Sequence, residues 1–430
     1  MSKPRTGDLV LGGQTQAQLG TAPHQSPASS NWVLGGLEGV KTRLNHPTAE
    51  VRCQALAEAL NYGEEGLKLV LAALAHPQAR VQWTAHQVLQ DWAEQVKPFL
   101  EHDRRDLKAL LTLRSHNPWP LFSCLQTWTA HPQSITSLAI APDSQLLVSG
   151  SQDKTLKLWS LSQDPVSPIN APPVNAKSTF RGHSDWISAI AFAPSPTAGP
   201  SRLISSSMDR TIRVWAMPTG NLQRILTLPE HFVKSLAPTP DGRQLLSGGL
   251  DAVLQLWDLT TGQPSQAWQR HQSGIQSVAV SPDGCWAASG SADGVIHLWD
   301  LAAGKWFGQL QGHLQMVTQL VWGRDRRTLL SSSIDKTIVL WDLKQRSLSH
   351  RFLGHFGAVN CLALSHDSRT LFSGGADGVI HIWDLRTRRL LHTLRGHQAP
   401  IYALGITAYC RRIMTGSEDG VINIWGVEGT

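Results

Sequence analysis

Serine, histidine and aspartate, which together form the catalytic triad of many hydrolases, recur in this sequence at fixed distances from a tryptophan. Seven tryptophans anchor the pattern, and the last six follow one another at intervals of 42 residues. An aspartate stands six residues before each of them, a hydroxyl residue stands ten residues before, and a histidine leads each unit. A catalytic constellation needs to occur once, at a cleft, whereas this set occurs seven times. The repetition therefore indicates a structural role in every unit.

The members of the pattern fall into four groups by residue type. The histidines are His131, His183, His231, His271, His313, His355 and His397. The hydroxyl residues are Ser149, Ser205, Ser247, Ser289, Ser331, Ser373 and Thr415. The aspartates are Asp153, Asp209, Asp251, Asp293, Asp335, Asp377 and Asp419. The tryptophans are Trp159, Trp215, Trp257, Trp299, Trp341, Trp383 and Trp425.

The repeated unit is built from short strands. Alternating runs such as Val295–Trp299 and Ile338–Trp341 are typical of strands, and Ser-Pro-Asp-Gly at 281–284 is typical of a turn. A self-similar unit of about 40–45 residues with four short strands predicts a propeller. Arg-Gly-His at 181–183 and 395–397, and Trp-Asp at 257–258, 299–300, 341–342 and 383–384, resemble the WD-repeat (WD40) family. The resemblance covers residues 119–430, although Trp159, Trp215 and Trp425 are followed by Ser, Ala and Gly.

The resemblance implies a mainly β protein with a seven-bladed WD40 propeller at 119–430. It also implies a role for each repeated residue. The aspartate belongs in the turn between the second and third strands, the histidine in the loop entering the first, the hydroxyl on the second and the tryptophan on the third. Each group then satisfies the next in a buried network, where an unpaired polar group would cost about 1–3 kcal/mol.

The last blade needs a strand from elsewhere in the chain, because only five residues follow Trp425. The segment Leu121–Trp128 precedes His131 in the way that Arg389–Leu394 precedes His397. We therefore expect strand 121–128 to close blade 7 and to remove an open sheet edge.

The N-terminal part of the chain has a different character. Residues 1–35 are rich in Gly, Gln, Ser, Pro and Thr without periodicity, which predicts a disordered arm. Apolar residues at helical spacing, such as Leu67, Val70, Leu71 and Leu74, predict a small all-α domain at 36–118. Its helices, expected at Ala49–Leu60, Glu65–Ala75 and Ala79–Ala93, resemble a short HEAT-like unit.

Composition argues against several classes of protein. The net charge of +6 comes with short arginine-rich stretches that have acids nearby, which makes nucleic acid an unlikely partner. Five widely spaced cysteines, never in a CxxC pair, favour reduced buried thiols in a cytoplasmic protein. Neither a signal peptide nor a membrane span is expected. Motifs for nucleotides, zinc proteolysis or calcium are missing, so we expect no enzyme, no cofactor and no metal site.

The function that follows is a non-catalytic scaffold or adaptor that presents the top face of the propeller to a peptide or protein partner. A regulatory subunit of an enzyme or signalling complex is the alternative, and binding of nucleic acid or an acidic surface is a third.

In WD repeats the top face near the channel is formed by residues three and five after each histidine and the residue before each aspartate. Most are small or polar here, and the resemblance makes the larger ones candidate partner-binding residues, namely Trp186, Met208, Phe232, Lys234, Leu250, Met316, Ile334 and Tyr402. They either form an exposed apolar patch or turn inward to plug the channel. Inserted loops at Ser162–Lys177 and Ser195–Arg202 are a second candidate, on the bottom face.

Overall fold

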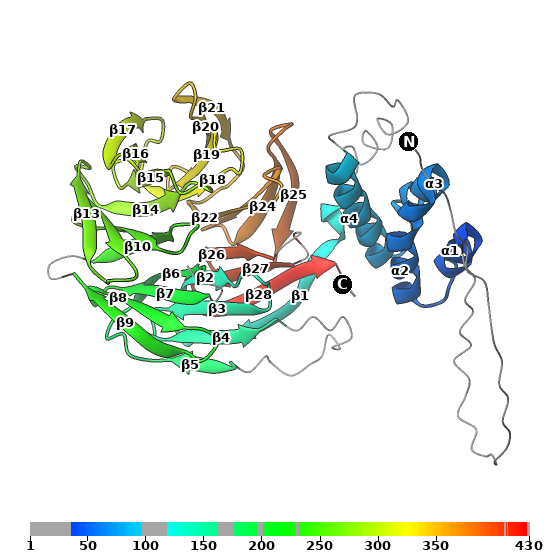
Figure 1. Cartoon of the computed structure of the whole chain (residues 1–430), viewed down its shortest axis with the longest axis horizontal. Coiled ribbons are helices and arrows are strands. Elements are labelled where there is room, and N and C mark those ends of the chain that lie inside the picture. Colours follow the sequence, from blue (N-terminus) through cyan, green and yellow to red (C-terminus); the bar gives the residue numbers. More distant parts are fainter. Residues whose placement is uncertain are drawn as a thin grey trace, which may run out of the picture.

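The computed structural model describes residues 36–96, 118–161, 176–195, 201–228, 232–407, 410 and 412–427. Helices occupy the first of these ranges, and strands occupy most of the rest, arranged as a ring (Figure 1). The expected N-terminal arm, the histidine at 231 and nearly all of the two inserted loops lie outside the described residues.

The helices pack around a small apolar core of their own. They are α1 (Gly36–Leu44), α2 (Ala49–Ala59), α3 (Gly63–Ala73) and α4 (Ala79–Val96), with a 3₁₀ turn at Leu60–Tyr62. Leu56, Val70 and Leu89 are buried together in this core. Buried Arg52 donates to the carbonyl of Pro47 and to the side-chain oxygen of Gln78, so it links the turn that follows α1 to the turn that follows α3.

The described strands form seven four-stranded antiparallel sheets, the blades of a β-propeller, which confirms the predicted fold class. Blade 1 contains β2 (Ile135–Ile140), β3 (Leu146–Ser151), β4 (Leu156–Ser160) and β5 (Ser178–Phe180). Blade 2 contains β6 (Ile187–Ala193), β7 (Arg202–Ser207), β8 (Thr211–Ala216) and β9 (Asn221–Thr227). Blade 3 contains β10 (Val233–Pro238), β11 (Gln244–Gly249), β12 (Val253–Asp258) and β13 (Pro264–Gln269). Blade 4 contains β14 (Ile275–Val280), β15 (Trp286–Ser291), β16 (Ile296–Asp300) and β17 (Lys305–Leu310).

The remaining blades follow the same order. Blade 5 contains β18 (Val317–Trp322), β19 (Thr328–Ser333), β20 (Ile338–Asp342) and β21 (Ser347–Phe352). Blade 6 contains β22 (Val359–Leu364), β23 (Thr370–Gly375), β24 (Val379–Asp384) and β25 (Arg389–Arg395). Blade 7 contains β26 (Ile401–Ile406), β27 (Arg412–Ser417), β28 (Val421–Val427) and β1 (Phe122–Thr129).

Burial within a blade depends on the strand. The second strand, such as β11, is buried along almost its whole length because it faces a neighbouring blade on each side. Its sequence is accordingly a run of apolar and small residues without polar alternation. The outermost strand, such as β13, is exposed along most of its length. The tryptophans of the repeat are buried between the blades.

Blade 7 takes its outer strand from the start of the propeller. β1 pairs antiparallel with β28, with Phe122 opposite Val427 and Trp128 opposite Ile422. The strand begins at Phe122, one residue later than the sequence suggested, because the backbone from Trp119 to Leu121 forms a 3₁₀ turn.

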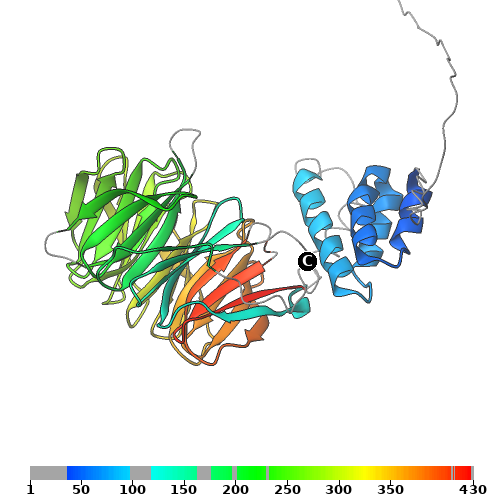
Figure 2. The same cartoon turned by 90° about the horizontal axis from the view of Figure 1, so that it is seen from below.

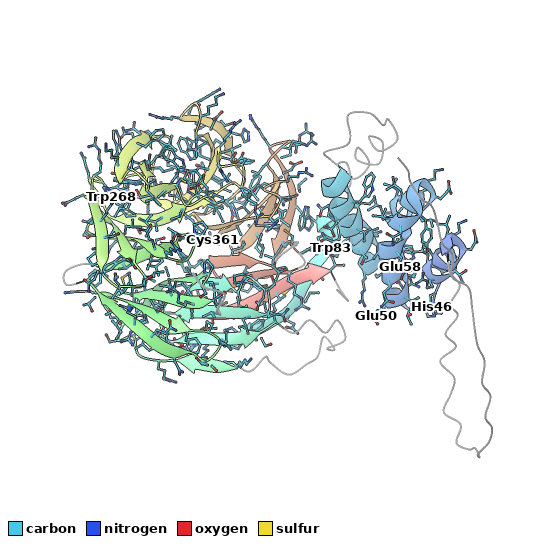
Figure 3. The ribbon with its side chains drawn as sticks, in the orientation of Figure 1. His46, Glu50, Glu58, Trp83, Trp268 and Cys361 are labelled. Atoms are coloured by element: carbon cyan, nitrogen blue, oxygen red, sulfur yellow. The ribbon has the colours of Figure 1, made fainter. Side chains whose placement is uncertain are left out.

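The helices meet the propeller beside β1 (Figure 2). Trp83 projects from α4 toward the ring (Figure 3) and is only 3% exposed. Its ring lies 5.1 Å from that of Phe122, edge to face, and 5.9 Å from that of Trp119. Trp119 in turn lies 5.3 Å from Phe372 of blade 6. A chain of aromatic rings therefore connects the helices to the last two blades.

The cysteines are free thiols, but the expectation that all are buried is wrong. Cys124 and Cys285 are exposed, whereas burial raises the pKa of Cys361 and of Cys410 to about 12. Cys124 is exposed because it lies on the outermost strand of its blade. In the described part of the chain, no helix is both long and apolar enough to cross a membrane.

Candidate functional site

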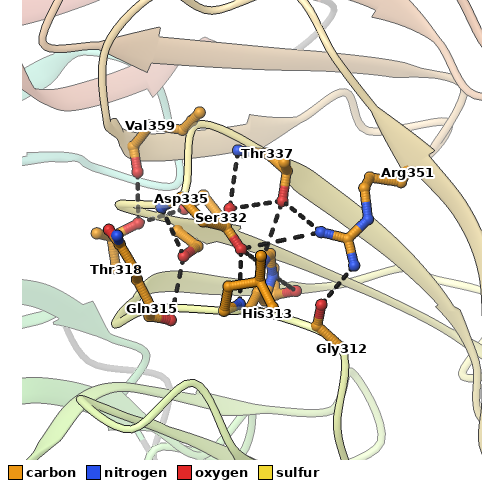
Figure 4. Close-up of polar contacts among 12 residues, drawn as sticks. Gly312, His313, Gln315, Thr318, Ser332, Asp335, Thr337, Arg351 and Val359 are labelled. Carbon is orange, nitrogen blue, oxygen red and sulfur yellow. Dashed lines mark hydrogen bonds and ion pairs between the residues drawn. The ribbon is translucent and has the colours of Figure 1, made fainter.

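Four blades contain a complete chain of hydrogen bonds from tryptophan to aspartate among the described residues. In blade 5, Trp341 Nε1 lies 2.8 Å from Ser331 Oγ, which lies 2.7 Å from His313 Nε2. His313 Nδ1 lies 3.0 Å from Asp335 (Figure 4). Blades 1, 2 and 6 have the same bonds, made by His131–Asp153, His183–Asp209 and His355–Asp377 with their hydroxyl and tryptophan partners.

The donors and acceptors allow only one direction of proton donation along this series of hydrogen bonds. An indole can only donate and a carboxylate can only accept, so the histidine carries its proton on Nδ1 and accepts from serine at Nε2. Burial alone would raise the pKa of Asp153, but hydrogen bonds from His131 and Thr155 outweigh it and hold that pKa at about 2. The aspartate is therefore an anchored anion, and the serine proton is directed at a nitrogen inside the fold.

Blades 4 and 7 differ from this pattern, which corrects the expectation of a closed network in every unit. His271 and His397 reach Ser289 and Thr415 at 2.6 and 2.7 Å. Their Nδ1 atoms are buried without a hydrogen-bond partner among the described residues. Asp293, the partner that the sequence predicts for His271, is exposed and accepts from the backbone of Val295. Asp419 is exposed as well.

The residue two positions after the aspartate accounts for part of this difference. In blades 1, 2 and 5 it is a threonine, and Thr337 Oγ1, for example, donates to Asp335 at 2.6 Å. In blades 4 and 7 it is a valine, Val295 or Val421, which has no hydroxyl to hold the carboxylate inward. Blade 6 also has a valine there, and its aspartate instead accepts from the backbone N–H of Phe356. In blade 3, Trp257 donates to Ser247 at 2.8 Å, and its histidine is outside the described residues.

Two further histidines, which the repeat pattern did not reveal, pack against this network. His297 lies 4.2 Å from His271 and His381 lies 4.3 Å from His355, ring centroid to ring centroid. Both stand two residues before the tryptophan, within Val-Ile-His, and that shared motif was the available signal.

The cluster of His355, Asp377 and His381 has the residue types of a metal site. Its ligand atoms lie within 4.8 Å of one another. All four ring nitrogens already have partners, however, because His381 contacts Thr393 Oγ1 at 2.8 Å and the carbonyl of Gly354 at 3.3 Å. A cation would have to replace hydrogen bonds that hold the blade together, so the geometry favours a structural network.

The predicted top-face positions are held together by one backbone hydrogen bond in each blade. In each blade, the residue before the aspartate of the repeat donates its backbone N–H to the carbonyl of the residue directly before the innermost strand. Met208 bonds Trp186 at 2.9 Å, Leu250 bonds Phe232 at 3.1 Å and Ile334 bonds Met316 at 3.1 Å. These pairs form a rim around the channel.

A second ring of residues lies just inside this rim, at a β-bulge that every innermost strand contains. The register shifts there by one residue, so the bulged side chain is displaced from the regular alternation. The seven bulge residues are Thr136, Ser188, Lys234, Gln276, Thr318, Asn360 and Tyr402. All of them line one cavity at the mouth of the channel.

This channel cavity has a volume of about 640 Å³. Of the predicted binding residues, six line it: Trp186, Met208, Lys234, Met316, Ile334 and Tyr402. Trp186, Ile334 and Tyr402 are 47%, 38% and 39% exposed, so their side chains stand at the mouth. Phe232 and Leu250 are not among the lining residues, and the Arg210 guanidinium lies 5.3 Å from the centre of the Phe232 ring.

Two exposed apolar residues on the rim were missed by the sequence analysis. Leu314 and Phe356 directly follow a leading histidine and are 86% and 84% exposed. The backbone N–H of each donates to the aspartate of its own blade, Asp335 or Asp377, which fixes its position. An apolar residue directly after the histidine, where blades 1, 2, 4 and 7 have Pro, Ser or Gln, was the signal that could have found them.

The arginine-rich turns make local contacts. Arg326 lies 3.5 Å from Asp283 and Arg388 donates to Ser349 of the preceding blade. The Arg346 guanidinium stacks 4.0 Å from the centre of the Phe307 ring. These contacts join adjacent blades.

Comparison with known proteins agrees with this geometry. The family described as "WD domain, G-beta repeat" matches seven segments, at 122–160, 175–216, 222–258, 262–300, 304–342, 346–384 and 388–426. A ribosome biogenesis protein WDR12 homolog of Drosophila virilis is 32% identical over 98 residues, which are 21% of this chain and 22% of that protein. A protein transport protein sec13 of Aspergillus oryzae is 33% identical over 93 residues, 21% of this chain and 29% of that protein.

The small ribosomal subunit protein RACK1 of Candida albicans is 34% identical over 109 residues, 25% of this chain and 27% of that protein. The aligned segments thus span less than a third of each of these three relatives. The repeat itself matches well over half of the chain, in the seven blades that the structure contains. This chain belongs to the WD-repeat family.

Proposed function

We propose that this protein is a non-catalytic adaptor that binds an extended peptide segment of a partner protein across the mouth of the propeller channel. The observation that carries the proposal is the set of exposed apolar side chains, Trp186, Ile334 and Tyr402, around a cavity of about 640 Å³. Apolar anchors that surround a polar hollow are typical of protein-binding sites.

The arrangement of the blades favours an extended ligand. Trp186 and Met208 lie on blade 2, and Met316 and Ile334 lie on blade 5. The rim between these two pairs is formed by Phe232 and Leu250 on blade 3 and by the small residues Gly274 and Ala292 on blade 4. A strand-like segment can therefore place alternate side chains against both apolar pairs while its backbone crosses the polar ring between them.

The alternative function, regulation of an enzyme or signalling complex, uses the same surface and differs in the identity of the partner. The relatives named above for ribosome biogenesis and protein transport indicate that repeats of this kind serve in different processes. The catalytic reading of the serine and histidine residues receives no support, because the serine hydroxyls of the network are buried and engaged at both ends.

A selection of linear peptides displayed on phage tests the proposal, with the full chain as bait. We expect the wild-type chain to enrich a set of related peptides, and the Trp186→Ala, Tyr402→Ala double variant to lose about tenfold or more in affinity for them, because hot-spot aromatics commonly contribute 2 kcal/mol or more.

The matched control is the Trp306→Ala, Phe307→Ala double variant, which removes two exposed aromatics from the outer strand β17, away from the channel. It should bind the selected peptides like the wild type. If the channel variant folds normally and keeps full affinity, the site lies elsewhere.

A further inference from the structure

Four of the seven bulge residues make a hydrogen bond that joins one blade to the next. Thr136 donates to the carbonyl of Ile187 at 2.7 Å, and Ser188 donates to that of Val233 at 2.6 Å. Thr318 and Asn360 donate in the same way to Val359 and Ile401 (Figure 4 shows the Thr318 bond). At these four positions the polar group of the bulge side chain is already engaged in holding two blades together.

Lys234 and Gln276, on the adjacent blades 3 and 4, depart from this pattern. In the described part of the chain, neither donates to the carbonyl of the next blade, and no hydrogen bond or ion pair is found for the Lys234 ammonium. Gln276 makes a single 3.4 Å contact with the carbonyl of Gly274, close to the outer limit for a hydrogen bond. Both side chains line the channel cavity.

The surroundings of Lys234 contain no compensating charge. It is the one charged residue among the described residues that line the cavity. Burial lowers its pKa from the ordinary value, because the ammonium is partly removed from water. A desolvated cation without a counter-ion is unfavourable in a folded protein, and it gains most from an anion that arrives with a ligand.

Two serine hydroxyls beside these residues add further donors. Ser235 Oγ accepts the N–H of Val278 at 3.1 Å, and Ser277 Oγ accepts that of Leu320 at 2.9 Å. Each hydroxyl therefore keeps its own hydrogen to donate, and both residues line the cavity. Ammonium, amide and hydroxyl donors thus line the same cavity, and no acidic side chain is among its described lining residues.

We propose that Lys234 and Gln276 form a carboxylate-binding subsite inside the channel mouth, which selects an aspartate or glutamate side chain within the peptide. The proposal rests on the proposed function, since the acidic residue belongs to the same bound peptide. One ammonium balances one carboxylate, whereas it would leave part of the charge of a phosphate dianion unbalanced. Apolar rim residues lie on both sides of the subsite. The acidic residue is therefore internal to the peptide, because a residue at a peptide terminus would have a neighbouring peptide residue to contact the rim on one side only.

The test uses four libraries of N-acetylated, C-amidated heptapeptides that are random except at the central residue, which is Glu, Gln, phosphoserine or Lys. Each library is captured on the immobilised full-length chain, and the bound fraction is measured. The wild type should retain the Glu library about tenfold better than the Gln library, the effect of one hydrogen bond to a charged group. Lys234→Met should reduce this ratio to about one, while Lys234→Arg should keep most of the preference.

Lys305→Met is the matched control, because it removes an equal charge from the exposed strand β17 and should leave the ratio unchanged. A Glu preference that survives in Lys234→Met, or equal capture of the Glu and Gln libraries by the wild type, would overturn the carboxylate subsite while leaving the peptide site intact. Better capture of the phosphoserine library than of the Glu library would overturn it in favour of a phosphate. Capture of none of the libraries would overturn both this subsite and the proposed function.

Discussion

At the scale of single residues, the buried histidines determine how the folded state responds to acid. Burial holds the pKa of His271 and of His397 at about 4, whereas histidine in an unfolded chain has a pKa of about 6.5. Between these values the unfolded chain binds more protons than the folded one. The contribution of these histidines to the free energy of unfolding is therefore fully present above about pH 6.5, and it is lost as the pH drops toward 4.

We expect each such histidine to lower the free energy of unfolding by about 1.4 kcal/mol per pH unit within this window. The measurement is a series of chemical denaturation curves from pH 7.5 to 4.5. A His397→Asn variant should show a shallower pH dependence than the wild type, whatever its stability at neutral pH. The same pH dependence in the two proteins would mean that folding does not lower the pKa of His397.

The aspartates of the repeat should differ in their contribution to stability. Asp335 accepts from His313, Thr337 and the backbone of Leu314, whereas Asp293 accepts from one backbone N–H. Asp335→Ala should lower the free energy of unfolding by about 1–3 kcal/mol, because it leaves buried donors unpaired. Asp293→Ala should change it by about 0.5 kcal/mol or less. Thermal melts of the two variants compare them directly, and equal losses would contradict the difference between the blades.

The spacing of residues made the histidine, hydroxyl and tryptophan positions predictable, since a repeat places equivalent residues in equivalent environments. The outcome for Asp293 was not predictable in this way, because it depends on whether a carboxylate finds enough donors to remain inside. Phe232 likewise occupies the predicted rim position, yet its ring lies against the Arg210 guanidinium and it is not among the residues that line the cavity. Such local competition leaves no periodic signal.

At the scale of elements, strand β1 closes the ring, and its removal should expose the edge of β28. A chain that lacks residues 1–130 should form aggregates or exchange strands between copies, because an unpaired edge templates further pairing. A chain that lacks residues 1–117 retains β1 and should remain a monomer. Size-exclusion chromatography with light scattering separates the two results. Monomers from both shortened chains would mean that the edge of β28 is protected in another way.

The boundaries of elements were predicted within a few residues where the hydrophobic pattern is strong, as for α4 and the strands around the tryptophans. The bulges at the start of every inner strand were not, because a single displaced residue hardly alters the alternation of apolar and polar side chains. Those bulges nevertheless decide which residues enter the channel, and they explain why Gln276 and Lys234 share one cavity.

At the scale of the whole molecule, Trp83 couples the helices to the propeller. Trp83→Ala should destabilise the protein by about 3–5 kcal/mol at this junction, because it removes a large buried side chain from the aromatic cluster with Phe122 and Trp119. Limited proteolysis should then cleave between the helices and the ring faster than in the wild type. Trp306→Ala is the control, since that ring is 39% exposed on an outer strand. Unchanged cleavage in Trp83→Ala would show that other contacts hold the two parts together.

The pairing of β1 with β28 also sets the order in which the molecule can be completed during its synthesis. β1 leaves the ribosome before any blade exists, and its partner is made about 300 residues later, near the end of the chain. At roughly 5–20 residues per second, β1 waits on the order of 15–60 s for that partner. Trp83, Trp119 and Phe122 are all made before the first complete blade, so the same aromatic contacts that join the two parts are available to shelter β1 during this interval.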